Sequence, residues 1–144
     1  MSFKDQQIHI LLIEDNPGDI YLMTTELKNI DIPNTLHIVV DGTHAIDFLK
    51  QSGSYEGAPK PNLIILDLNL PRIDGRDVLN FIKSSPDLNK IPLLIVSASD
   101  EDSNILDSYN PQLNIFIKKP DSLKAFHSLI HQIRDFIKNS YKRK

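Results

Sequence analysis

Several polar side chains stand directly after short apolar runs, at the points where buried strands would end. They comprise three carboxylates, one hydroxyl and one ammonium group: Glu14, Asp15, Asp67, Ser97 and Lys119. Carboxylates that gather in one place repel one another unless a cation lies among them. Hard oxygen donors of this kind suit Mg²⁺, which keeps much of its water and takes one or two protein carboxylates plus phosphate oxygens. The group is therefore suited to phosphate chemistry, provided that the fold brings it together.

Each of these residues also has a structural explanation when it is taken alone. Asp15 lies near an expected helix start, and Ser97 is a common type of turn residue. Lys119 before Pro120 would ordinarily be a surface lysine. The functional interpretation therefore depends on the elements that position these side chains.

The stretch around Asp67 predicts the central strand of a sheet. Residues 63–66 are an unbroken run of Leu and Ile, which is typical of a strand buried on both faces in a parallel sheet. Asp67 then emerges at the carboxyl end of that strand, and ligands of open α/β sheets bind at this edge. Further strands are expected at residues 8–13, 36–40, 91–96 and 115–117.

Amphipathic patterns between these runs predict helices at residues 20–30, 43–49, 76–85, 103–109 and 123–137. Strands that alternate with helices form a parallel sheet with right-handed crossovers and helices on both faces. We therefore expect one doubly wound α/β domain over residues 1–144, with a core at about 7–139 and a basic tail at 140–144. Segment 51–62 holds two Gly and two Pro and is expected to be a surface loop.

The composition argues against several classes of function. Sixteen basic and 19 acidic residues give a net charge of -3, so there is no general signal for binding nucleic acid or membranes. The absence of cysteine excludes disulfides, catalysis by a cysteine and zinc sites with cysteine ligands. No apolar run approaches the roughly 20 residues of a membrane span, and the first residues do not form a signal peptide. We therefore expect a cytoplasmic protein.

Together, these motifs resemble the receiver domain of two-component response regulators over nearly the whole chain. The resemblance rests on Glu14-Asp15, Asp67-Leu68-Asn69, Ser97 and Lys119-Pro120, each of which follows an expected strand. It implies a flavodoxin-like fold of five parallel strands in the order 2-1-3-4-5, which places the first and third strands side by side.

The resemblance also implies roles for these residues. Asp67 would be the phosphoacceptor, and its carboxylate would attack phosphorus to form an acyl phosphate. Mg²⁺ would be bound by the carboxylates of Glu14, Asp15 and Asp67 and by the backbone carbonyl of Asn69. The ammonium group of Lys119 would stabilise oxygens of the transferred group.

Two residues would report phosphorylation to the surface. Ser97 would hydrogen-bond the phosphoryl group, and Phe116 stands where receivers carry a switching aromatic residue; the alternative is an ordinary apolar residue of an edge strand. The signal would reach the surface formed by helix 103–109, strand 115–117 and the final helix, through which many relatives form homodimers. Lys118 replaces a residue that is commonly apolar, and the alternation of the strand predicts that it is exposed.

The implied function is that of a stand-alone response regulator rather than an enzyme. A histidine kinase would phosphorylate Asp67, and a downstream protein of unknown identity would bind the changed surface. Residues 12–19, residues 67–71 and the long loop at 51–62 are similar to the small regulators of phytochrome-type histidine kinases.

Two alternatives stay open. A haloacid-dehalogenase-type phosphatase also uses an aspartate nucleophile, Mg²⁺ and a lysine, but it needs a second aspartate two residues after the nucleophile, where this chain has Asn69. A receiver-like interaction module that is never phosphorylated would share the fold, although the intact acidic set argues against it.

The histidines offer no second site at this level. His127 and His131 lie four residues apart on one expected helix, a spacing that can bind zinc. No third ligand accompanies them in the local sequence, so we expect surface histidines.

Overall fold

The computed structural model of the chain describes residues 7–68, 75–97 and 114–142. Within these residues the strands are β1 (Ile8–Ile13), β2 (Asn34–Val39), β3 (Leu63–Asp67), β4 (Leu93–Ser97) and β5 (Asn114–Lys118). The α-helices are α1 (Pro17–Leu27), α2 (Gly42–Lys50), α3 (Gly75–Ser84) and α4 (Leu123–Lys142). Two short 3₁₀ helices, η2 (Gly53–Tyr55) and η3 (Leu88–Lys90), precede β3 and β4.

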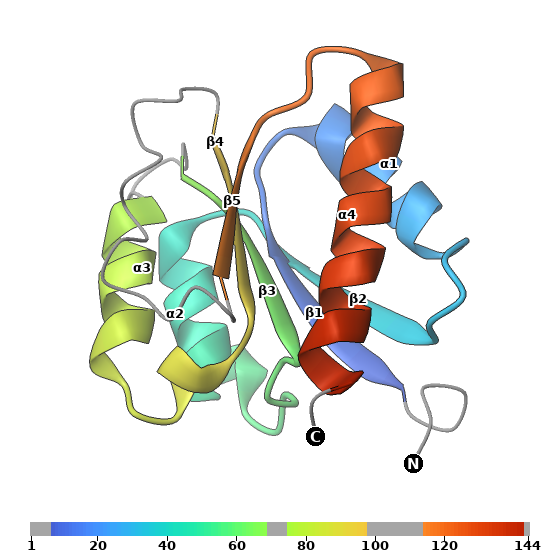
Figure 1. The fold of residues 1–144 in the computed structure, drawn as a ribbon. Helices are drawn as coiled ribbons and strands as arrows, with labels where there is room; N and C mark the ends of the chain where they lie inside the picture. Colours follow the sequence, from blue (N-terminus) through green and yellow to red (C-terminus); the bar gives the residue numbers. More distant parts are fainter. Residues whose placement is uncertain (1–6, 69–74, 98–113, 143–144) are drawn as a thin grey trace.

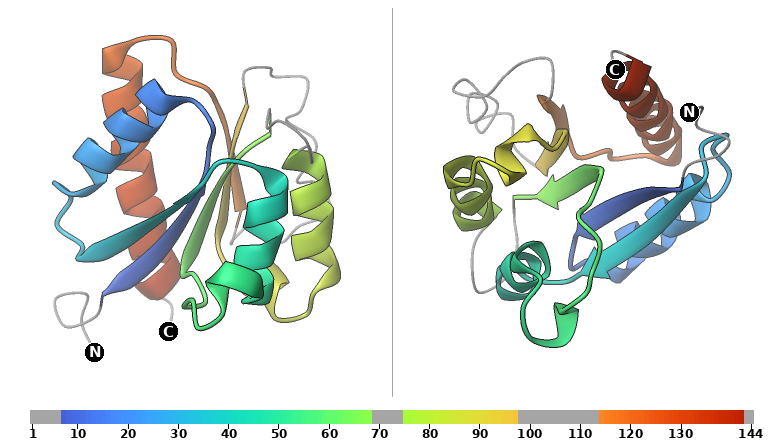
Figure 2. Two further views of the ribbon diagram at one scale, coloured as in Figure 1. Left: turned by 180° about the vertical axis from the view of Figure 1, so that it is seen from behind. Right: turned by 90° about the horizontal axis from the view of Figure 1, so that it is seen from below.

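The five strands form one parallel sheet in the order β2-β1-β3-β4-β5, which confirms the predicted fold class. Helices α1 and α4 cover one face of the sheet, and α2 and α3 cover the other (Figure 1). The views from behind and from below show the same three layers (Figure 2). The carboxyl ends of all five strands therefore meet at one edge, the upper edge in Figure 1.

The core is divided by the sheet into two layers. Alternate residues of one strand enter different layers, so Leu11 packs toward α2 and α3 whereas Leu12 packs toward α1 and α4. All five residues of β3 are buried, as expected for a strand that is covered on both faces. Each layer gains its stability from apolar area removed from water, at about 25 cal/mol per Å².

The strands agree closely with the sequence prediction, and the helix starts are set by side-chain caps. Helix α1 begins three residues earlier than expected because the side chain of Asn16 accepts a hydrogen bond from the Asp19 N–H at 3.0 Å and Pro17 suits the first helical position. Strand β2 begins at Asn34, two residues before the expected start, and ends at Val39. The helix expected at 103–109 lies outside the described residues.

The expected loop at 51–62 contains local structure. Gln51 ends α2 in the left-handed conformation, with a φ of 57°, and Gly57 has a φ of 85°. Both residues turn the chain sharply, and helix η2 lies between them. Among the described helices, none is both long enough and apolar enough to cross a membrane.

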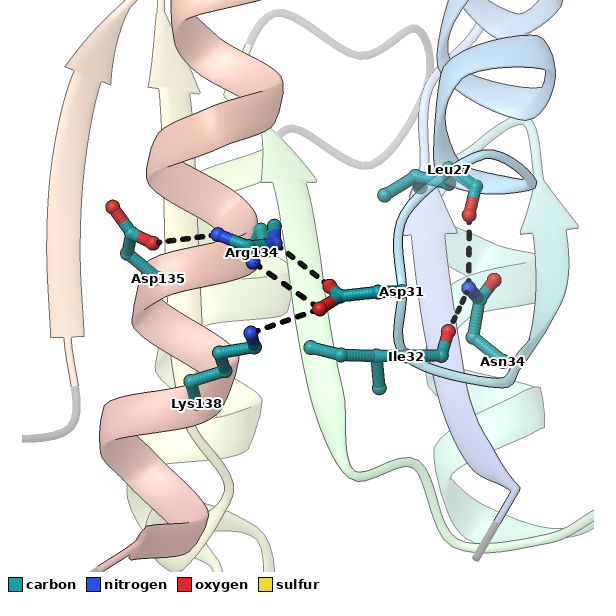
Figure 3. Close-up of polar contacts among 7 residues, drawn as sticks. All are labelled: Leu27, Asp31, Ile32, Asn34, Arg134, Asp135 and Lys138. Atoms are coloured by element: carbon teal, nitrogen blue, oxygen red, sulfur yellow. Dashed lines mark hydrogen bonds and ion pairs between the residues drawn. The ribbon is translucent and has the colours of Figure 1, made fainter. Parts of the chain in front are cut away.

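Helix α4 is joined to the segment between α1 and β2 by an ion-pair network (Figure 3). The guanidinium of Arg134 donates two hydrogen bonds to the carboxylate of Asp31, at 2.7 and 3.2 Å, and Lys138 Nζ donates a third at 3.0 Å. These two cations hold the pKa of Asp31 well below its usual value. On the other side of this segment, the side-chain amide of Asn34 donates to the carbonyl of Leu27 at 2.9 Å.

Candidate functional site

The described residues of the predicted site lie together at the carboxyl edge of the sheet. Asp67 is the last residue of β3, and only 2% of its surface is exposed. Because Ile13 of β1 pairs with Leu66 of β3, the residues that come next in the chain, Glu14 and Asp67, lie side by side. The parallel pairing of β1 with β3 thus brings together Glu14 and Asp67, which are far apart in the sequence.

Lys119 directly follows β5, the edge strand next to β4. Its backbone N–H donates to the carbonyl of Ser97 at 2.6 Å, which joins the end of β5 to the end of β4. Its Nζ lies 3.0 Å from Asp67 Oδ2 and 3.5 Å from Glu14 Oε1. The ammonium group also lies 3.3 Å from Asp19 Oδ2, so three carboxylates surround one cation.

Glu14 is buried in the pocket beside Asp67. Its residue surface is 6% exposed, and Oε2 accepts the backbone N–H groups of Asp15 and Asn16 at 3.1 and 3.2 Å. Burial raises the pKa of Glu14 from 4.5 to about 7, and hydrogen bonding to Asp67 and the charge of Asp67 add to the increase. The N–H of Asn16 and the charge of Lys119 oppose this increase without cancelling it.

The charge of Lys119 is fixed by the same surroundings. Burial acts to lower the pKa of the ammonium group, but the hydrogen bond and charge of Asp67, followed by Glu14 and Asp19, outweigh it. The pKa of Lys119 therefore lies above its usual value, and the group is a permanent cation at neutral pH.

The carboxylates of this pocket fit a hard divalent cation. Oxygen atoms of Glu14, Asp15 and Asp67 all lie within 4.8 Å of one another, and no other group of three acidic or histidine side chains in the described part of the chain is so close. Asp15 is exposed, which leaves one side of the group open to water. An all-oxygen donor set with an open side suits Mg²⁺ or Mn²⁺, which retain water molecules when they bind proteins.

Comparison with known proteins assigns a family to this geometry. The family model described as the response regulator receiver domain matches residues 10–131. The chain belongs to this family.

Two receiver proteins illustrate the likeness. Response regulator Rcp1 from Synechocystis sp. is 42% identical over 127 residues, which cover 88% of this chain and 86% of Rcp1. A crystal structure of Rcp1 in its Mn²⁺-bound form has a TM-score of 0.81 at 41% identity and covers 90% of this chain and 93% of that chain. The phosphorylated cyanobacterial phytochrome response regulator RcpA has a TM-score of 0.82 at 40% identity, and the match covers 91% of this chain and 94% of RcpA.

Of the remaining residues predicted for the receiver site, some lie in the described part of the chain and one does not. Ser97 ends β4 and is fully buried beside the pocket. Phe116 lies in the middle of β5, where it is half-buried and packs on the α2/α3 side of the core. Asn69 lies outside the described residues. Lys118 is exposed, as the alternation of the strand predicted.

Two contributors to the receiver pocket were not predicted from the sequence. Asp19 lies within the acidic run after β1, but only the structure shows that the first turn of α1 brings it to Lys119. Gly75 approaches the backbone behind Asp67, because a Cβ at this position would lie 2.5 Å from Leu68 Cα and 2.8 Å from the Asp67 carbonyl oxygen. Only glycine permits this approach of α3 to the end of β3.

Proposed function

We propose that this protein is a phosphoacceptor response regulator whose Asp67 receives a phosphoryl group from a histidine kinase. The observation that carries the proposal is the buried Asp67 carboxylate with Lys119 Nζ at 3.0 Å, at the carboxyl edge of the central strand. Membership of the receiver family and the likeness to RcpA, which was crystallised in its phosphorylated form, support it.

The chemistry assigned to Asp67 is nucleophilic. One carboxylate oxygen attacks the phosphorus of a phosphohistidine, the new O–P bond forms, and the P–N bond breaks as the imidazole leaves with a proton. The product is an acyl phosphate on Asp67. Burial favours the step because the nucleophile enters it with few water molecules to remove.

Charge neutralisation is assigned to the groups around the nucleophile. Lys119 would move its hydrogen bond from Asp67 to an oxygen of the phosphoryl group, and its permanent positive charge would stabilise that oxygen. Glu14, Asp15 and Asp67 would hold Mg²⁺, which when bound supplies further positive charge to the phosphoryl oxygens. Asn69 is the further metal ligand expected from the sequence.

Signalling is assigned to the strands next to the site. The hydroxyl of Ser97 would hydrogen-bond the phosphoryl group, and Phe116 on the adjacent strand would respond through its half-buried ring. The signal would reach β5, α4 and the segment between β4 and β5, where a downstream protein or a second copy of the chain would bind.

The first test measures phosphorylation without a kinase. Wild-type protein incubated with acetyl phosphate should gain the mass of one phosphoryl group when Mg²⁺ is present, and none in EDTA. Asp67→Asn should gain none, whereas the matched control Asp87→Asn, an exposed carboxylate with no side-chain cap bond, should behave as wild type. Equal phosphorylation of Asp67→Asn would reject Asp67 as the acceptor.

The second test concerns the kinase. We propose a phytochrome-type histidine kinase as the partner, because solved relatives include phytochrome response regulators. Purified kinases loaded with phosphate on histidine should transfer it faster to this protein when they are phytochrome-type than when they are not. Equal transfer rates from both groups would reject the pairing while leaving the phosphoacceptor chemistry intact.

A further inference from the structure

Side chains of types that can bind metals line a groove between α1 and α4, apart from the acidic pocket at the sheet edge. The groove has a volume of about 350 Å³, and its wall includes Glu26 from α1 and both His127 and His131 from α4. The sequence predicted surface histidines because no third ligand stands beside them in the local sequence, and both histidines are exposed. A candidate third ligand comes from elsewhere in the chain: Glu26 lies 101 residues before His127, but its carboxylate lies 3.5 Å from the His127 ring.

We propose that Glu26, His127 and His131 bind a divalent transition-metal ion of the Zn²⁺ type. His127 Nδ1 and Glu26 Oε1 lie 3.5 Å apart, which is longer than a good hydrogen bond of about 2.7–3.2 Å. Two ligands that each bind one tetrahedral Zn²⁺ at about 2.0–2.2 Å are separated by roughly 3.3–3.5 Å. The nitrogen and the carboxylate oxygen are therefore already at the separation that a shared ion requires.

His131 supplies the third ligand from the next turn of the same helix. Residues four apart lie on one face of an α-helix, and helical zinc sites use histidine pairs at this spacing. In the present side-chain conformations His131 is not within 4.8 Å of both other donors. Its side chain is exposed and lines the same groove, so rotation about its side-chain bonds can bring it to the ion without disturbing the core.

The charges around the groove permit a cation. Glu26 provides one negative charge, and its side chain is 24% exposed, so it is partly desolvated without being buried. Arg134 also lines the groove, but its guanidinium is bound by both oxygens of Asp31 (Figure 3). This positive charge in the wall of the groove is thus already balanced by a carboxylate.

The proposed site differs in chemistry from the acidic pocket at the sheet edge. Two imidazoles and one carboxylate favour Zn²⁺, Co²⁺ or Ni²⁺, whereas the all-oxygen pocket favours Mg²⁺ and Mn²⁺. A bound ion would join α1 to α4. Helix α1 follows Glu14 in the chain and α4 follows Lys119, so each helix follows a residue of the acidic pocket. The site would therefore link the two helices on one face of the receiver.

The test is a titration of the full chain with Co²⁺ and Zn²⁺ in excess Mg²⁺. Tetrahedral Co²⁺ with nitrogen ligands absorbs visible light strongly, whereas octahedral Co²⁺ at the oxygen pocket absorbs weakly. We expect one equivalent of the strongly absorbing species, displaced by Zn²⁺. His127→Gln, His131→Gln and Glu26→Gln each remove a proposed ligand and should weaken binding by more than the roughly 10–100-fold that loss of a residue hydrogen-bonded to a ligand causes.

His9→Gln is the matched control, because His9 Nδ1 lies 3.0 Å from His37 Nε2 in a separate histidine pair. This variant should bind Co²⁺ and Zn²⁺ as wild type does. Loss of binding in His9→Gln, unchanged binding in the three groove variants, or a wild type without the strongly absorbing species would each overturn the proposal. As a second readout, Zn²⁺ should raise the Tm of wild type and of His9→Gln but not of His131→Gln.

Discussion

Replacing Glu14 by Gln should change how the stability of the metal-free protein depends on pH. The pKa of Glu14 is raised from 4.5 to about 7 in the folded chain, so the folded state binds more protons than the unfolded state between these values. The stability that Glu14 contributes is therefore fully present below its unfolded pKa and is lost as the pH rises through about 7. The interval between the two pKa values corresponds to roughly 3 kcal/mol.

The glutamine variant isolates this effect because it removes the charge and keeps an oxygen acceptor. The amide oxygen can still accept the N–H groups of Asp15 and Asn16, which Glu14 Oε2 accepts at 3.1 and 3.2 Å. Urea unfolding in EDTA should give a free energy of unfolding that falls, from about pH 5 to about pH 8, by about 2–3 kcal/mol more in wild type than in Glu14→Gln. The exposed control Glu56→Gln should give a curve parallel to wild type.

Magnesium provides the second arm of this experiment. At about pH 8 Glu14 is ionised and adds a negative charge to the acidic pocket, so Mg²⁺ should stabilise wild type more than Glu14→Gln. If the free energy of unfolding in EDTA depends on pH equally in wild type and Glu14→Gln, the reasoning is refuted. Burial and the neighbouring Asp67 would then not raise the pKa of Glu14.

Three further predictions concern other parts of the fold. Gly75→Ala should lower the free energy of unfolding by about 1–3 kcal/mol in urea, because the new Cβ would meet Leu68 Cα at 2.5 Å; wild-type stability would contradict this close approach. Burial, followed by a neighbouring imidazole, lowers the pKa of His37, so wild type should lose stability as the pH falls below about 6.5 and His37→Asn should lose less; identical acid unfolding curves would contradict the assignment. Asp31→Asn should cause only a small loss of Tm that added salt removes, because the ion pair with Arg134 is largely exposed, and a loss that persists in high salt would contradict this view.

The fold could be predicted from the sequence because its strands are apolar runs of sufficient length. The run before Asp67 contains no polar alternation, and only a strand covered on both faces buries all of it. Helix starts were less accurate, since the expected start at Ile20 followed the apolar periodicity whereas the cap at Asn16 determines where the helix begins. The order of the strands came from the family resemblance and was confirmed.

The site was predictable where residues follow strand ends and unpredictable where helices bring side chains together. Asp67 ends a strand, and Glu14 and Lys119 each directly follow one, so parallel topology alone brings them to one edge. Asp19 reaches Lys119 from the first turn of α1, and this contact depends on the rotation of that helix about its axis. The contact between Glu26 and His127 likewise requires the packing of α1 against α4, which no local spacing encodes.

The central claim is tested most directly by locating the phosphoryl group on the chain. Borohydride reduces an acyl phosphate to the alcohol, which converts a phosphorylated aspartate into homoserine that survives digestion and mass spectrometry. After treatment with acetyl phosphate and Mg²⁺, we expect homoserine at position 67 and unmodified aspartate at positions 15 and 19. Homoserine at another position, or none in a protein whose intact mass shows one phosphoryl group, would contradict the account of Asp67 as the phosphoacceptor.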